Sequence, residues 1–109
     1  MLIAVASKDG KEINQHFGHA ERFFIYDVED DDAKLVDLRL VERYCSLDIE
    51  HPLRGDLLRK ISETLTGCRA VVIAQIGEHP KAELEKLGIE TFTTDGLIKP
   101  TLVELAKIL

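Results

Sequence analysis

The run AVVIA at residues 70–74 is continuously apolar and mostly β-branched, a pattern typical of a strand that is buried on both faces. A second run of this kind, LIAVA, occupies residues 2–6. Strands buried on both faces occur in sheets that carry helices on both sides. We therefore expect these two runs to lie next to each other at the centre of one sheet.

Two further strands are predicted between these runs. Residues 22–29 are rich in aromatic and β-branched side chains, and residues 34–44 place Val36, Leu38 and Leu40 on one face of a strand. The acidic residues 29–32 that connect them are too charged to bury. A connection this short predicts an antiparallel hairpin.

Three segments are predicted as helices. Five side chains of the first fit one helical face, with Gly67 where a helix-ending glycine is expected: Leu53, Leu57, Leu58, Ile61 and Leu65. Shorter helices are predicted at residues 80–87 and 100–109, with a strand at 89–93 between them. The three prolines, Pro52, Pro80 and Pro100, stand at or just before the predicted helix starts, where proline is tolerated.

This order of elements predicts an α/β protein that forms a single domain over residues 1–109. We expect a mixed five-stranded sheet in the order 3-2-1-4-5, with strand 2 antiparallel to the others and helices on both faces. The carboxyl ends of strands 1, 3, 4 and 5 then share one edge, where open α/β sheets bind ligands.

The loops at that edge contain the residues best suited to bind a metal. They hold every histidine of the chain and one of its two cysteines: His16, His19, His51, His79 and Cys45. Imidazole and thiolate are ligands for iron and other transition metals, so His16, His19 and Cys45 could hold a metal cluster. Solvated loop histidines and a half-buried cysteine are the alternative interpretation.

Two other residues near these strands have simpler explanations. Gly77, just after the fourth strand, either lets a ligand approach the backbone or only makes a turn. Cys68 precedes a buried strand and is expected to fill the core.

The composition excludes several classes of function. The chain carries 14 Lys and Arg against 20 Asp and Glu, a net charge of −6, with no basic stripe that would bind nucleic acid or an anionic membrane. The N-terminus has neither a signal peptide nor a membrane span, and two cysteines without paired spacing suggest a cytoplasmic protein. Phosphate-binding glycine motifs and a serine nucleophile motif are absent from the sequence.

A small metal-dependent hydrolase or nuclease using Asp9 and Asp27, with Asp37 facing solvent, remains an alternative.

The segment INQHFGHA at residues 13–20, followed by FFIYDV at 23–28, closely resembles the dinitrogenase iron–molybdenum cofactor biosynthesis family. This family comprises the NifX-like proteins, and its domain also occurs at the C-terminus of the NifB cofactor-synthesis enzyme. VERYC at 41–45 and GCRAV at 67–71 extend the similarity over nearly the whole chain. The resemblance implies a ribonuclease-H-like three-layer fold without nuclease activity. It also implies binding or carriage of the iron–molybdenum cofactor, or of an iron–sulfur precursor cluster, during nitrogenase maturation.

The family motifs bear on three of the expected site residues. His16, His19 and Cys45 fall on matching positions and are expected to be metal ligands. Gly18, Arg22, Arg43 and Gly77 complete the expected cofactor-binding set, with the two arginines offsetting the charge of the cluster. The resulting expectation is a non-catalytic carrier that receives the cluster from one maturation protein and passes it to another.

One segment departs from the family pattern. Many members are glycine-rich where this chain has SLDIEH at residues 46–51, so a role for His51 as a substitute ligand stays open. A metal-free regulatory or protein-interaction domain is the second interpretation of the same fold.

Overall fold

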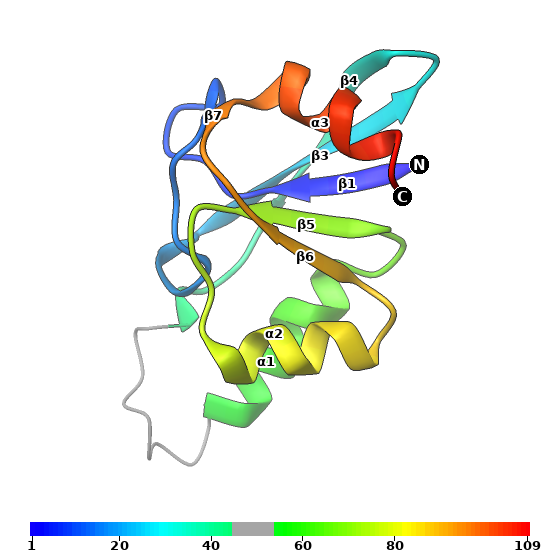
Figure 1. Cartoon of the computed structure of the whole chain (residues 1–109). Coiled ribbons are helices and arrows are strands. Elements are labelled where there is room, and N and C mark those ends of the chain that lie inside the picture. Colours follow the sequence, from blue (N-terminus) through cyan, green and yellow to red (C-terminus); the bar gives the residue numbers. More distant parts are fainter. Residues whose placement is uncertain (45–53) are drawn as a thin grey trace.

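A five-stranded mixed sheet forms the centre of the protein (Figure 1). The computed structural model describes residues 1–44 and 54–109, so the expectations for Cys45, His51 and Leu53 lie outside the described residues. The strands are, in spatial order, β4 (Asp32–Leu40), β3 (Arg22–Glu29), β1 (Leu2–Val5), β5 (Ala70–Ile73) and β6 (Glu90–Thr93). β1 runs parallel to β5 and antiparallel to β3, and β5 runs parallel to β6.

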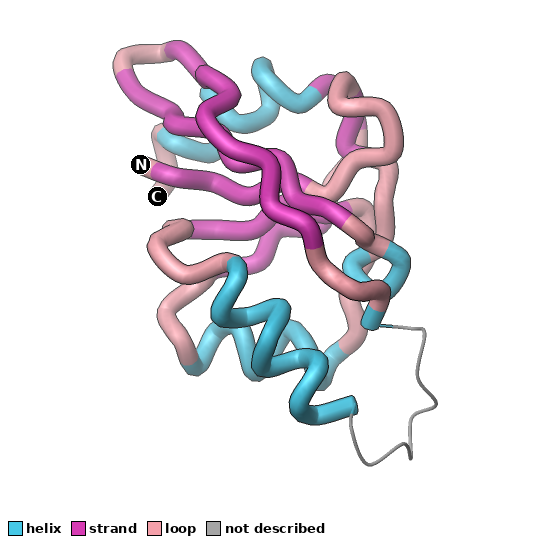
Figure 2. The backbone as a smooth tube through the Cα atoms, turned by 180° about the vertical axis from the view of Figure 1, so that it is seen from behind, coloured by secondary structure: helices cyan, strands magenta, loops and turns pink. Residues whose placement is uncertain are grey.

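Helices cover both faces of this sheet (Figures 1 and 2). α1 (Arg54–Thr64) and α2 (Glu78–Lys86) lie together on one face, and α3 (Ile98–Ala106) covers the other. The prediction of a mixed α/β protein with helices on both faces of a five-stranded sheet is therefore confirmed.

The alternation of side chains in β1 and β5 explains why both strands are wholly apolar. Ala4 and Val71 point toward α1 and α2, whereas Ile3 and Val72 point toward α3. All four side chains are completely buried. Since each face of the sheet is covered by a helical layer, neither strand has a position where a polar side chain could reach water.

The two shorter helices begin earlier than the sequence pattern predicts. α2 starts at Glu78 and α3 at Ile98, which makes Pro80 and Pro100 the third residue of their helices. The first helical turn lacks carbonyl partners for its N–H groups, so a proline there removes no hydrogen bond. The predicted end of α3 at residue 109 is also wrong, because regular hydrogen bonding stops at Ala106.

The predicted hairpin between β3 and β4 is confirmed. Asp30 and Asp31 form its turn with φ values of 51° and 63°, the two positive angles that a tight two-residue hairpin loop requires. A break in register after Ile25 disrupts β4, so that Leu35 faces Tyr26 and Asp37 faces Ile25. Leu38 and Leu40 face Phe24 and Arg22 and so share a face as predicted, but Val36 is the extra residue of this bulge and interrupts the regular alternation.

β4 also ends sooner than predicted, at Leu40 rather than residue 44. It is an outer strand of the sheet, and four of its apolar side chains are exposed: Leu35, Val36, Leu38 and Leu40.

A second, two-stranded sheet was not expected from the sequence. β2 (Glu12–Ile13) pairs antiparallel with β7 (Gly96–Leu97), joining the loop after β1 to the loop after β6. Strands of two residues are too short to show a periodic pattern. Ile13 is fully buried under α3, so this small sheet anchors the first loop to the core.

In the described part of the chain, every helix is too short or too polar to cross a bilayer.

Replacing Leu57 by alanine should lower the free energy of unfolding by about 2–5 kcal/mol, the usual cost of truncating a buried leucine. Leu57 is 6% exposed and packs in the layer between α1 and the sheet. Urea unfolding of the wild type and the variant measures the difference. Leu40→Ala is the matched control, because Leu40 is 75% exposed. Its cost should stay below about 0.5 kcal/mol, and equal costs for both variants would disprove the assigned helix face.

Candidate functional site

The loop that carries His16 and His19 is fixed to the end of a central strand. The N–H of Ala74 donates to the carbonyl of Gln15 at 3.0 Å, and the N–H of Phe17 donates to the carbonyl of Gln75 at 2.8 Å. Together with the parallel bridge between His16 and Gln75, these bonds extend the pairing beyond β5. The histidine loop thus lies at the carboxyl-end edge of the sheet.

A buried phenylalanine sets the direction of the two histidines. Phe17–His19 form a single 3₁₀ turn, in which Phe17 is 2% exposed and enters the core layer beneath α1 and α2. Its ring lies 6.0 Å from that of Phe23 and 6.1 Å from that of Tyr44, measured between centroids. Because Phe17 points inward, His16 and His19 on either side of it point outward, and their ring centroids are 6.0 Å apart.

Arg43 binds one of these rings directly. Its terminal nitrogen Nη2 lies 3.0 Å from Nδ1 of His19, and its Nε lies 4.0 Å from a carboxylate oxygen of Glu21. Arg43 therefore connects the segment after β4 to the histidine turn. The expectation that Arg43 lies near the histidines agrees with this geometry.

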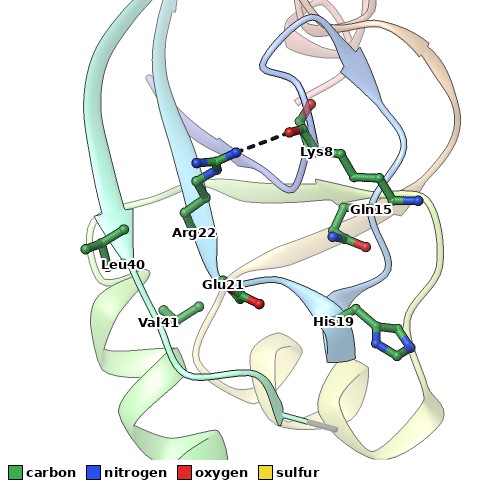
Figure 3. Close-up of a pocket in the computed structure, with 8 residues that line it drawn as sticks. Lys8, Gln15, His19, Glu21, Arg22, Leu40 and Val41 are labelled. Atoms are coloured by element: carbon green, nitrogen blue, oxygen red, sulfur yellow. Dashed lines mark hydrogen bonds between the residues drawn. The ribbon is translucent and has the colours of Figure 1, made fainter. Parts of the chain in front are cut away.

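An open pocket of about 520 Å³ lies between the histidine loop, β3 and the end of β4 (Figure 3). Its lining is mostly polar and consists of Ser7, Lys8, Gln15, His19, Glu21, Arg22, Leu40 and Val41. Arg22 reaches across from β3 and donates to the carbonyl oxygen of Lys8 at 3.1 Å. Its guanidinium also lies 5.7 Å from the centroid of the Phe24 ring, a contact that holds the charge in place.

The pocket is locally basic although the chain as a whole is acidic. Lys8 and Arg22 line it against one carboxylate, Glu21, and Arg43 lies against both Glu21 and His19. The chain carries a net charge of −6, so the charge around this pocket is opposite in sign to the net charge of the protein. An anionic ligand is the species that such a pocket favours.

Neither His79, a histidine of the loops expected at this edge, nor Gly77, an expected cofactor-binding residue, lines this pocket. His79 is exposed in the first turn of α2 and lines a groove between α1 and α2. Gly77 is the residue that precedes α2 and is not among the described residues that line the pocket. Its φ of −73° is open to any residue, and an added Cβ would meet only Pro80 at ordinary contact distance, so the turn does not require glycine.

The described residues do not form a complete metal site by themselves. Within residues 1–44 and 54–109, no three side chains of His, Cys, Asp or Glu come together in a way that could hold a metal ion. The rings of His16 and His19 are adjacent, but Nδ1 of His19 faces Nη2 of Arg43 at 3.0 Å, so further protein ligands would have to come from elsewhere. Cys68 is no candidate, since it is buried, burial raises the pKa of its thiol, and its role as a core filler is confirmed.

The carboxylates of the hydrolase alternative do not converge. Asp27 faces Leu2 at the start of β1 and pairs with the N-terminal ammonium group at 3.2 Å, whereas Asp9 follows the other end of β1. Asp37 is exposed and paired with Arg39 at 3.0 Å. The proposed pairing of Asp9 with Asp27 is therefore wrong, because the length of β1 separates them.

Sequence reasoning missed six residues that line the pocket: Ser7, Lys8, Gln15, Glu21, Leu40 and Val41. Lys8 stands two residues after the end of the apolar run 2–6, and a cation so close to the carboxyl end of a central strand is a signal that could have been used. The other five depend on the exact ends of β1, β3 and β4 and on the path of the histidine loop, which no local pattern specifies.

The chain is similar to proteins of nitrogenase cofactor synthesis. The family model described as dinitrogenase iron–molybdenum cofactor matches residues 1–107. The FeMo cofactor biosynthesis protein NifB of Frankia alni is 38% identical over 105 residues, which cover 96% of this chain and 21% of that protein. NifB of Bradyrhizobium diazoefficiens is 43% identical over 90 residues, covering 83% and 17% respectively. The chain thus spans about a fifth of the length of these relatives.

A solved structure has a similar fold, and the similarity covers most of both chains. The crystal structure of the protein PH0822 superposes with a TM-score of 0.66 at 25% identity, covering 97% of this chain and 88% of that one.

Asp9 organises the loop that leads to the histidines, and its replacement by asparagine should destabilise the protein in a pH-dependent way. N–H groups of Lys11 and Glu12 donate to this carboxylate at 2.9 and 3.1 Å and hold its pKa below the ordinary 3.8. A lowered pKa contributes stability that is present above the unfolded value and is lost as pH falls through the folded value.

The stability difference between wild type and Asp9→Asn should therefore be greatest near neutral pH and shrink as pH falls below 3.8. Urea unfolding across this range measures it, with Asp31→Asn at the tip of the exposed hairpin as the control. A difference that stays constant with pH would show that the charge of Asp9 is irrelevant to the loop.

Proposed function

The chain belongs to the dinitrogenase iron–molybdenum cofactor family, and on that premise we propose that it is a non-catalytic carrier domain for an anionic metal–sulfur cluster. The cargo would be the iron–molybdenum cofactor or an iron–sulfur precursor of it. Donor and acceptor would be other proteins of nitrogenase maturation, and the exchange would take place in the cytoplasm.

The observation that carries this proposal is the position of His16. Its ring is exposed at the carboxyl-end edge of the sheet, beside His19, on a turn that is bonded to the end of β5. Within the described residues, no hydrogen bond engages the ring of His16. A rigidly placed, open imidazole is suited to bind iron without a large change in the protein.

The surrounding charge supports an anionic cargo. Lys8 and Arg22 line the adjoining pocket, and Arg43 lies beside His19. A cluster with net negative charge would gain from these cations, whereas nucleic acid is disfavoured by the acidic remainder of the chain. The exposed position of the pocket leaves room for a partner protein to reach the cargo.

Few ligands suit a carrier, because each extra metal–protein bond slows release. We propose His16 as the principal metal ligand, with Cys45 as a second ligand and the ring of His19 as a further contact to the cluster. Cys45 lies outside the described residues, but Tyr44, which precedes it in the chain, packs against Phe17 between the two histidines. Permanent clusters are instead held by complete sets of cysteine thiolates.

The same family assignment leads us to propose the ribonuclease-H-like type for the fold. The order β4-β3-β1-β5-β6, with β3 alone antiparallel to its neighbours, supports this proposal. Catalysis by paired carboxylates, as in a nuclease, is not part of it, since Asp9 and Asp27 lie at opposite ends of β1.

A metal-free interaction domain is a second candidate, favoured by the outer strand β4. Four of its apolar side chains are exposed and could be covered by another protein: Leu35, Val36, Leu38 and Leu40. A strand edge of this kind is a common docking surface for a second chain.

His16→Ala should weaken binding of a synthetic, thiolate-capped 4Fe–4S dianion by about 10-fold or more, the scale on which changes around a metal ligand alter affinity. Anaerobic titration followed by absorbance and by bound iron measures the affinity. His79→Ala is the matched control, because it removes an exposed histidine that lines a different groove.

The control variant should bind like the wild type. Equal affinity of the wild type and His16→Ala would remove His16 from the ligand set. A wild type that takes up no cluster under these conditions would overturn the carrier proposal and favour the interaction domain.

A further inference from the structure

We infer that Arg43 is a specificity-determining residue that makes the histidine site select anionic metal–sulfur species over bare divalent cations. The inference rests on the proposed function and concerns the same site. It starts from the contact between Nη2 of Arg43 and Nδ1 of His19, which are 3.0 Å apart.

The direction of this hydrogen bond follows from the chemistry of arginine. A guanidinium group has five N–H donors and no acceptor, and it stays charged in proteins. Nδ1 of His19 must therefore be the acceptor, so its lone pair points at Arg43. A neutral imidazole has one lone-pair nitrogen and one N–H, which places the hydrogen of His19 on Nε2.

The two histidines consequently offer different chemistry. His19 presents an N–H from Nε2 and has its lone pair occupied, so it can donate to a sulfide but cannot coordinate a metal while Arg43 stays in place. In the described part of the chain, the ring of His16 makes no hydrogen bond, and its lone pair is open. One coordinating nitrogen beside one N–H donor matches the edge of a metal–sulfur cluster, which exposes both metal and sulfide.

A bare divalent cation meets the opposite situation. It needs several lone pairs, but Arg43 removes the one on His19 and adds a positive charge next to it. The carboxylate of Glu21 lies 4.0 Å from Nε of Arg43 and is 72% exposed, so water screens this ion pair. Arg43 therefore favours anions over cations in two ways. It occupies the lone pair of His19 that a cation would need, and its positive charge repels cations.

Calorimetric titration with ZnCl₂ tests this inference without any cluster. Arg43→Ala should raise the zinc affinity by about 10-fold or more, since it frees a second imidazole nitrogen beside His16. Arg22→Ala is the matched control, because it removes a cation that lines the pocket beside His19 but bonds to the carbonyl of Lys8 and not to His19. Its effect should stay below about threefold, as expected for an exposed, screened charge.

The double variant Arg43→Ala/His19→Ala separates these two effects. It should lose most of the gain, because the freed nitrogen is no longer there. Two results would overturn the role of Arg43 as a block on His19. One is a gain in zinc affinity that persists in the double variant, and the other is an equal gain in Arg22→Ala. Either would mean that only the positive charge of Arg43 lowers the zinc affinity.

Long-range ¹H–¹⁵N ring correlations of the metal-free wild type provide a test that needs no variant. The inference requires hydrogen on Nε2 and an acceptor at Nδ1 of His19, and a protonated Nδ1 would refute it. Arg43→Ala should also weaken binding of the 4Fe–4S dianion. If the wild type bound no cluster at all, the proposed function would fail, while the zinc and ring measurements would still decide the role of Arg43.

Discussion

The rest of the site depends on two main-chain hydrogen bonds that join the histidine loop to the end of β5. The N–H of Ala74 donates to the carbonyl of Gln15, and the N–H of Phe17 donates to the carbonyl of Gln75. They continue the buried parallel pair of β1 and β5 by a few residues beyond the regular sheet. Phe17 can then enter the core while its neighbours His16 and His19 stay in water. The same packing that stabilises the fold thus presents two imidazoles at one edge.

The sequence predicts the central layer of the fold well, because the signals there are local and strong. The apolar runs 2–6 and 70–74 identify two buried strands, and Asp30 with Asp31 forms the predicted hairpin turn. The bulge at Val36 and the pairing of β2 with β7 were not predicted, since both depend on contacts between segments far apart in the chain. Helix starts shifted by two residues because proline is tolerated throughout the first turn.

The candidate site was predictable in part. His16 and His19 follow from a motif and from the rule that ligands gather at the carboxyl ends of strands. The bond between Arg43 and His19 could not be read from the sequence, because it depends on how the chain turns after β4. The same is true of the pocket wall formed by Leu40 and Val41. Cys45 and His51 stay predictions, as they lie outside the described residues.

The central claim is that an imidazole of this edge binds the metal of the cargo. Pulsed electron paramagnetic resonance of the protein, labelled with ¹⁵N-histidine and loaded with a reduced, paramagnetic 4Fe–4S cluster, tests this most directly. We predict nuclear modulation from a directly bound histidine nitrogen, which disappears in His16→Ala. A cluster that binds stoichiometrically without any histidine nitrogen coupling would contradict the account.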